Sequence, residues 1–392
     1  VRTSMSGANE RSRFAFLLND IDLPDGAYER AERRYQDLAD WISRPESTVS
    51  PFDAHIFVQG SFALGTAIRP VNPEEEYDLD FSCVLREGVT RDTCTQSRLK
   101  EMIGLELEAY RTARGIKSAL GAKRRCWRLS YQDNLAFHMD VVPALPADDQ
   151  NRALLVERMA GAGMDKSLAE KVARRAVWIT DDQHADFHSL SRNWPSSNPG
   201  GYQRWFLSRM EGGKSQTLTE RAQVDPVPVY RAREPLQQTV QLLKRHRDVM
   251  FAQNPDLKPA SILITTLAGQ ACVPGEPLEQ TLSRTLALLR HVRNEKVSQI
   301  LNPINPAENF ADRWSGNNCP LRRNFYGWID EALRAFEDWR TLSVPQRLIE
   351  VASDDFAVTL RADDARAMSG GSSETSTVRP VSIAAAPAPW RH

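Results

Sequence analysis

The chain has few cysteines, and they form no pattern. Its 392 residues include five cysteines. These are scattered along the chain: Cys83, Cys94, Cys126, Cys272 and Cys319. No two of them stand at a C-x-x-C spacing, and an odd number cannot pair completely. The sequence therefore supports neither a zinc ribbon nor a disulfide framework.

The sequence also lacks an excess of charge of one sign and a long apolar run. The 50 Lys and Arg residues nearly balance the 51 Asp and Glu residues, and the net charge is -1. Such a chain has no global electrostatic reason to coat nucleic acid or an anionic membrane. With no recognisable secretory signal and no apolar stretch of membrane-spanning length, we expect a reducing, cytoplasmic location and no membrane association.

The length and the overall composition of the chain predict a globular protein with more than one core. Hydrophobic residues make up 41% and charged residues 26% of the chain, which is ordinary for a globular protein. A chain of 392 residues is long for one core. We expect a lobe over 1–200 that includes a long N-terminal helix, a helical lobe over 201–350, and a segment over 351–392 that is disordered from about 369.

Residues 55–142 carry short apolar runs that alternate as strands do. These runs are HIFV, YDLDFSCVL, RRCWRLSY and LAFHMDVV, with a turn candidate at Asp133-Asn134 before the last. Helical spacing predicts helices over 26–44, 95–113, 238–251, 260–272, 278–294 and 324–340. The charged stretch 145–192 favours further helices, followed by a loop over 193–202. The expected fold class is α+β, a mixed sheet with flanking helices plus a helical second lobe.

The strand YDLDFSCVL places two carboxylates on one face. Side chains alternate along a strand, so Asp78 and Asp80 share the face opposite the apolar residues, with Cα atoms roughly 6.5–7 Å apart. Two carboxylates this close repel each other, and ionising both calls for a cation between them. Such oxygen ligands suit Mg²⁺ completed by water and substrate phosphates.

The strand LAFHMDVV supplies a third carboxylate by the same alternation. Phe137, Met139 and Val141 form the apolar face, which leaves His138 and Asp140 on the other. If this strand lies beside the first, Asp140 joins Asp78 and Asp80. A site for two metal ions, Mg²⁺ or Mn²⁺, then becomes the expectation.

Gly60-Ser61 follows the strand HIFVQ and precedes a short helix over FALGTAI. Glycine lets the backbone turn sharply next to a ligand. Ser61 stands where an N-cap is expected, and backbone N–H groups at a helix start suit a triphosphate. Each feature has an ordinary explanation, because G-S is common in turns and D-x-D is common on solvated strand edges. The order, spacing and shared strand phase of all three favour a nucleotide site.

With these residues in place, the chain resembles the polymerase-β-like nucleotidyltransferases, and among them the bacterial CD-NTases, the cGAS/DncV-like cyclic oligonucleotide synthases. The resemblance rests first on Gln59-Gly60-Ser61-Phe62, Thr66, Arg69-Pro70, Asp78-Leu79-Asp80 and His138-Met139-Asp140-Val141-Val142-Pro143. It continues in NPGGYQRWF (198–206), LLKRHRD (242–248), PASILITTLA (259–268) and NPINPAENFADRW (302–314). It covers roughly residues 10–345.

The resemblance implies a role for each matching residue. Asp78 and Asp80 match the metal-binding pair, and Asp140 matches the carboxylate that faces the acceptor hydroxyl. Gln59 and Ser61 match donor-nucleotide contacts. In the helical lobe, Lys244 and Ser261 resemble the lysine and serine that hold the triphosphate, although a solvated helix lysine and an N-cap serine are the ordinary interpretations. No role is assigned to Asn309.

The implied activity is synthesis of a cyclic di- or trinucleotide from ATP, GTP or other NTPs for anti-phage (CBASS) signalling. A ribose hydroxyl would attack the α-phosphate and release pyrophosphate. Two partners are implied by the family, a HORMA-type activator and a ubiquitin-transfer-like enzyme that ligates the C-terminus. Two alternatives stay open, a template-independent RNA-tailing enzyme and a catalytically silent nucleotide-binding regulator.

The shortness of the basic clusters argues against the RNA-tailing alternative, because such an enzyme needs a basic groove for the acceptor strand. Lys123-Arg124-Arg125 and Arg322-Arg323 are short. The pairs Arg174-Arg175 and Lys244-Arg245 could bind a polyanion, but a solvated helix face is the expected explanation for both. Nor does the sequence offer clustered Cys and His ligands for the zinc thumb of a nucleic-acid sensor.

Overall fold

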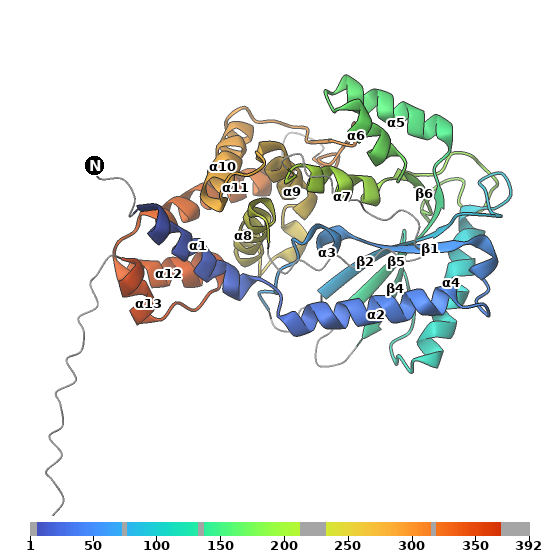
Figure 1. Ribbon diagram of the computed structural model, residues 1–392, viewed down its shortest axis with the longest axis horizontal. Helices are drawn as coiled ribbons and strands as arrows, with labels where there is room; N and C mark the ends of the chain where they lie inside the picture. The colour runs from blue at the N-terminus through green and yellow to red at the C-terminus, as the bar shows by residue number, and fades with distance from the viewer. Residues whose placement is uncertain (1–5, 73–76, 132–136, 212–232, 315–318, 370–392) are drawn as a thin grey trace, which may run out of the picture.

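The computed structural model describes residues 6–72, 77–131, 137–211, 233–314 and 319–369. Figure 1 shows a sheet covered by helices beside a cluster of helices. The sheet contains β1 (Ala54–Gln59), β2 (Tyr77–Leu85), β3 (Gly121–Ala122), β4 (Trp127–Tyr131), β5 (Phe137–Pro146), β6 (Val177–Ile179) and β7 (Ser196–Ser197). The expected turn at Asp133-Asn134 lies outside the described residues. So does the tail expected to be disordered from about 369, apart from residue 369 itself.

The sheet is mixed, as expected. Its order is β1-β2-β5-β4-β3, with β6 pairing β5 and β7 pairing β6. The central pair β2 and β5 is parallel, whereas the other neighbouring strands are antiparallel. Parallel strands are usually buried on both faces. Here β2 is buried on both faces only from Ser82 onward, and its first half opens one face to solvent.

One face of the sheet packs on α2 (Asp25–Ser43) and α4 (Gln96–Ala113). The predicted apolar phase of β2 is confirmed, because Leu79, Phe81 and Cys83 are buried in this core. Tyr35 of α2 stacks on Phe81 with ring centroids 5.1 Å apart, and its hydroxyl donates to the Ile56 carbonyl. Packing on this face forces the polar residues of β2 to the other face.

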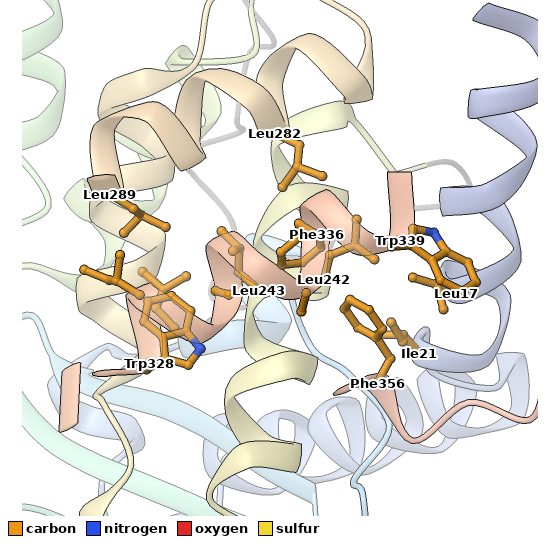
Figure 2. Packing of buried hydrophobic residues seen from close by; sticks show 14 of the residues in the cluster. Leu17, Ile21, Leu242, Leu243, Leu282, Leu289, Trp328, Phe336, Trp339 and Phe356 are labelled. Carbon is orange, nitrogen blue, oxygen red and sulfur yellow. The ribbon is translucent and has the colours of Figure 1, made fainter. Parts of the chain in front are cut away.

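A second core holds the helical lobe together. It joins α8 (Pro235–Met250), α9 (Ser261–Ala271), α10 (Leu278–Asn294), α11 (Pro320–Thr341), α12 (Pro345–Phe356) and α13 (Ala362–Met368). Figure 2 shows Leu242 and Leu243 of α8 packed among Trp328, Phe336 and Phe356. Burying side chains of this size contributes roughly 1.5–3 kcal/mol each. No described helix is long and apolar enough to cross a bilayer.

The first helix packs with the helical lobe. Leu17 and Ile21 of α1 (Ser6–Ile21) lie in the second core, beside Trp339 and Phe356 (Figure 2). The chain then crosses to the sheet through α2. The division at residues 200 and 350 stays a prediction, but the packing assigns α1 to the core of the helical lobe and not to that of the sheet.

The remaining elements link the two cores. A third core joins α3 (Gly60–Leu64) with α5 (Asp149–Gly161), α6 (Lys166–Ala173), α7 (Pro199–Ser208) and α8. The short elements are η1 (Ser50–Phe52), η2 (Pro255–Leu257), β8 (Leu301–Asn302) and β9 (Asn305–Asn309). The phosphate-cradle candidate α3 thus lies where the sheet meets the helical elements.

Most predicted helices are present, but the predicted loop over 193–202 is partly wrong. Its end is the first turn of α7, which begins at Pro199. Proline suits the first helical position, because its N–H would be unpaired there. The Asn198 side chain caps the helix by accepting from the Gly201 N–H at 2.8 Å. The expected helices over 145–192 likewise end at Ala173, and β6 follows.

Candidate functional site

The strand register brings the three predicted carboxylates together. In the parallel pair, Asp78 lies beside His138 and Asp80 lies beside Asp140. All four residues alternate with the buried apolar residues, so they share the open face of the sheet. The hypothesis that the two strands are neighbours is therefore confirmed.

The carboxylates differ in their exposure to solvent. The Asp78 side chain is 62% exposed and that of Asp140 is 14% exposed. Burial, together with the charges of Asp78 and Asp140, raises the pKa of Asp80 to about 7. The nearby positive charges of Arg128 and Lys244 do not offset the burial and the negative charges around this carboxylate. A cation beside Asp80 would relieve both the burial penalty and the repulsion.

Gly60 lies directly against the Asp80 carboxylate. Its φ is +66°, a left-handed conformation that glycine adopts without strain. A Cβ at this position would meet Asp80 Oδ2 at 2.2 Å and Cγ at 3.1 Å. Glycine is therefore required twice, by the backbone angle and by the carboxylate. This contact joins the turn after β1 to the acidic cluster.

The expectation that Ser61 caps the following helix is wrong. The helix α3 begins at Gly60, its N-cap residue is Gln59, and Ser61 is the second helical residue. The left-handed Gly60 starts the helical turn one residue earlier than the sequence suggests. Gln59 pairs with Asp80 across the strands, and its Oε1 accepts from the Ser82 hydroxyl at 2.9 Å. The nucleotide contacts of Gln59, Gly60 and Ser61 stay predictions.

A residue that the sequence did not single out stands at the centre of the cluster. Arg128 lies opposite Asp140 in the antiparallel pair of β4 and β5. Its Nε and Nη2 donate to the two Asp140 oxygens at 2.7 and 2.6 Å. Nη1 lies 3.4 Å from His138 Nδ1, and His138 Nδ1 lies 3.6 Å from Asp78 Oδ1. The alternation around buried Leu129 could have indicated Arg128, had the pairing of this strand been known.

Lys244 approaches the site from the helical lobe. Its amine is buried and donates to the Thr66 carbonyl at 2.8 Å. Burial lowers its pKa to about 8, partly offset by the Asp80 charge. Lys244 and the adjacent Arg245 are 7% and 3% exposed, so the expected solvated face is wrong for this pair. The face is covered because α8 lies between α3 and the second core.

Ser261 occupies a different environment. It is exposed and is the first residue of α9, whose N-cap residue is Ala260. The N-cap interpretation of this serine is therefore wrong by one position. Within the described part of the chain, no hydrogen bond or ion pair joins it to the acidic cluster. Its triphosphate role stays a prediction, as does that of Lys244.

Three buried glutamines tie the helical elements to the segment after Gly60. Gln203 of α7 donates to the Ala63 carbonyl at 3.0 Å, and Gln237 of α8 donates to the Leu64 carbonyl at 2.9 Å. Gln241, one helical turn later, donates to the Ala67 carbonyl at 2.9 Å. With Lys244, these side chains satisfy the carbonyls at the end of α3. They fix the segment that carries Gly60 and Ser61.

Comparison with known proteins agrees with this geometry. Residues 54–143 match the nucleotidyltransferase domain described as cyclic GMP-AMP synthase DncV-like. The chain is also 27% identical over 343 residues to a c-di-GMP synthase of Roseivirga ehrenbergii, covering 86% of this chain and 81% of the relative. Together these similarities indicate a bacterial CD-NTase.

Solved CD-NTases share the fold. The CdnG of Bradyrhizobium diazoefficiens, determined with GTP, superposes with a TM-score of 0.63 at 20% identity, covering 93% of this chain and 98% of that chain. The CdnC of E. coli MS115-1, determined with HORMA-deltaN, has a TM-score of 0.58 at 14% identity, covering 90% and 97%. The expected mixed sheet with flanking helices is therefore the fold of these nucleotidyltransferases.

The donor set of this CD-NTase suits a hard divalent cation. Carboxylate oxygens are the ligands that Mg²⁺ and Mn²⁺ prefer. A cation beside Asp80 would offset the burial and the neighbouring negative charges that raise the pKa of this carboxylate. Yet no group of three His, Cys, Asp or Glu side chains within the described residues is arranged to hold an ion. Both oxygens of Asp140 instead accept from the guanidinium of Arg128.

Proposed function

We propose that this CD-NTase makes a cyclic di- or trinucleotide from ATP, GTP or other nucleoside triphosphates. One observation carries the proposal: the register sets Asp80 beside Asp140 while Gly60 touches the Asp80 carboxylate. A carboxylate cluster against a glycine turn suits a metal-bound triphosphate. Similarity to a c-di-GMP synthase and to CdnG supports a cyclic product.

Asp78, Asp80 and Asp140 would together hold two divalent ions, either Mg²⁺ or Mn²⁺. A metal ion held there would neutralise charge on the phosphates and would lower the pKa of the attacking hydroxyl. The protein positions the reactants. The Gly60 turn lets the backbone approach the phosphates, and the glutamines of α7 and α8 hold that turn in place. Buried Asp140 faces the acceptor side of the cluster in this proposal.

The reaction joins a ribose oxygen to an α-phosphorus. The new P–O bond forms as the bond to the β-phosphate breaks, and pyrophosphate leaves while the hydroxyl loses its proton. A second transfer within the linear product closes the ring. This chemistry depends on alignment and charge neutralisation more than on covalent catalysis by the protein.

Incubation with labelled NTPs and Mg²⁺ or Mn²⁺, followed by phosphatase, tests the proposal. A small phosphatase-resistant product supports cyclisation, because a ring has no terminal phosphate. A ladder of lengthening products would instead indicate an RNA-tailing enzyme. Absence of turnover with every combination of NTP and metal would indicate a nucleotide-binding regulator.

The proposed context is anti-phage (CBASS) signalling in the cytoplasm. The CdnC relative was determined with a HORMA partner, and activation by a HORMA-type partner is one proposal for this chain. The other is ligation of the C-terminus by a ubiquitin-transfer-like enzyme. Deleting residues 370–392 and challenging cells with phage tests the second proposal. Protection equal to that of the full chain would remove it.

A further inference from the structure

The guanidinium of Arg128 contacts the carboxylate cluster, but the proposed reaction gives this residue no role. Both oxygens of Asp140 accept from it, at 2.7 and 2.6 Å. The same Nη2 lies 3.8 Å from Asp78 Oδ1. The guanidinium is thus the cationic partner of Asp140.

A divalent ion and this guanidinium compete for the same oxygens. Mg²⁺ requires carboxylate oxygens at about 2.0–2.1 Å in near-octahedral geometry. A bidentate guanidinium fixes both oxygens in its own plane. An ion between Asp80 and Asp140 would also lie close to the guanidinium, and two cations at short range repel each other. Each oxygen keeps a second lone pair, so the opposition comes from charge repulsion and from the carboxylate orientation that the fork fixes. Both are relieved when Arg128 releases the carboxylate.

Arg128 has room to make that release. Its side chain is 28% exposed, and that of Asp140 is 14% exposed. The guanidinium can therefore move toward solvent without opening the buried face of the sheet. That face is formed by Leu129 and its neighbours on the opposite side of β4.

We propose that Arg128 is a positioning residue that holds Asp140 in the empty enzyme and weakens metal binding there. The inference rests on the proposed function, because it takes Asp140 as a metal ligand. In the empty site, Arg128 limits repulsion among the three carboxylates. When the metal takes its place, the released guanidinium remains beside the cluster as a free cation. The triphosphate is the anion that a planar guanidinium is suited to meet.

Binding of Mn²⁺ alone, followed by the electron paramagnetic resonance signal of free Mn²⁺, tests this proposal without turnover. Arg128→Met should bind Mn²⁺ about tenfold more tightly than wild type, because a charge-assisted pair no longer opposes the ion. Arg128→Lys should lie between the two, since a lysine offers one contact and no fork. Circular dichroism and thermal unfolding show whether each variant is folded.

Arg86→Met is the matched control. Arg86 donates to both oxygens of Asp53 at 2.7 and 2.9 Å, with a side-chain exposure of 29%, but it lies outside the acidic cluster. This variant should bind Mn²⁺ as wild type does. Equal affinity of wild type and Arg128→Met, with both folded, would overturn the proposal.

The double variant Asp78→Asn with Asp80→Asn separates the two levels of inference. If it loses Mn²⁺ binding while Arg128→Met matches wild type, the metal site stands and only the role of Arg128 fails. If it keeps both Mn²⁺ binding and product formation, the assignment of the metal to the acidic cluster fails, and the role of Arg128 fails with it. The proposed function fails only if wild type, with Mn²⁺ bound, makes no nucleotide product.

Discussion

Replacing Gly60 with alanine should disable the site by two effects that can be measured separately. The first is backbone strain, because φ is +66° and an alanine in the left-handed region costs about 1–2 kcal/mol. The second is contact with the site, because the new Cβ would meet Asp80 Oδ2 at 2.2 Å. Either the carboxylate or the turn after β1 must move.

Gly115→Ala isolates the first effect. Gly115 has a φ of +63°, and within the described part of the chain no heavy atom lies within 4 Å of the added Cβ. The two variants share the strain and the loss of unfolded-state freedom. Gly60→Ala should lose a further 1–3 kcal/mol, roughly the range for overpacking. The total for Gly60→Ala is then about 2–5 kcal/mol.

Urea unfolding of both variants, with NTP turnover measured in parallel, provides the assay. Gly115→Ala should keep wild-type turnover, whereas Gly60→Ala should lose at least about tenfold because Asp80 is displaced from a geometry that depends on precise alignment. Equal unfolding free energies for the two variants, together with wild-type turnover in Gly60→Ala, would refute the contact between Gly60 and Asp80.

Two further predictions concern the charge on Asp80 and the support of α3. Below its pKa of about 7, Asp80 holds a proton in the folded state that an ordinary aspartate releases near pH 4 in the unfolded state. Without metal, the stability of wild type should therefore fall as pH rises from about 4 to 7, by at most about 4 kcal/mol and less where water screens the charge. Asp80→Asn should lack this fall, and Mg²⁺ should reverse it in wild type alone. Urea midpoints from pH 4 to 8, measured in EDTA and in Mg²⁺, check this, and parallel curves for the two proteins in EDTA would contradict it. Gln237→Met should leave the Leu64 carbonyl unpaired and lower the free energy of unfolding by about 1–3 kcal/mol. Because the Gly60 segment is then less firmly held, the variant should raise KM for NTP more than it lowers kcat. Steady-state kinetics check the split, and an unchanged KM in a destabilised variant would limit Gln237 to a structural role.

The acidic cluster was predictable because the strands carry a strong alternation. Because Leu79 and Phe81 are buried on one face of β2, Asp78 and Asp80 must lie on the other face. Asp140 lies on the open face of β5 for the same reason, since its neighbour Met139 is buried. That β2 and β5 are neighbours could not be derived from spacing alone. It came from the resemblance, and the register confirms it.

Arg128 was missed because its partner depends on how β4 pairs, which one sequence does not show. The environment of Lys244 was missed for a related reason. A run of lysine and arginine on a helix usually faces water, but here α8 is enclosed and its polar side chains reach backbone carbonyls. The Asn198 cap similarly turned a Pro-Gly-Gly stretch, typical of loops, into a helix start.

Mass spectrometry of the small products made from all four NTPs with Mg²⁺ tests the central claim most directly. Wild type should yield a cyclic di- or trinucleotide. Asp78→Asn with Asp80→Asn, verified as folded by circular dichroism, should yield none. The same cyclic product from the folded double variant would contradict the assignment of the acidic cluster, and linear chains from wild type would contradict cyclisation.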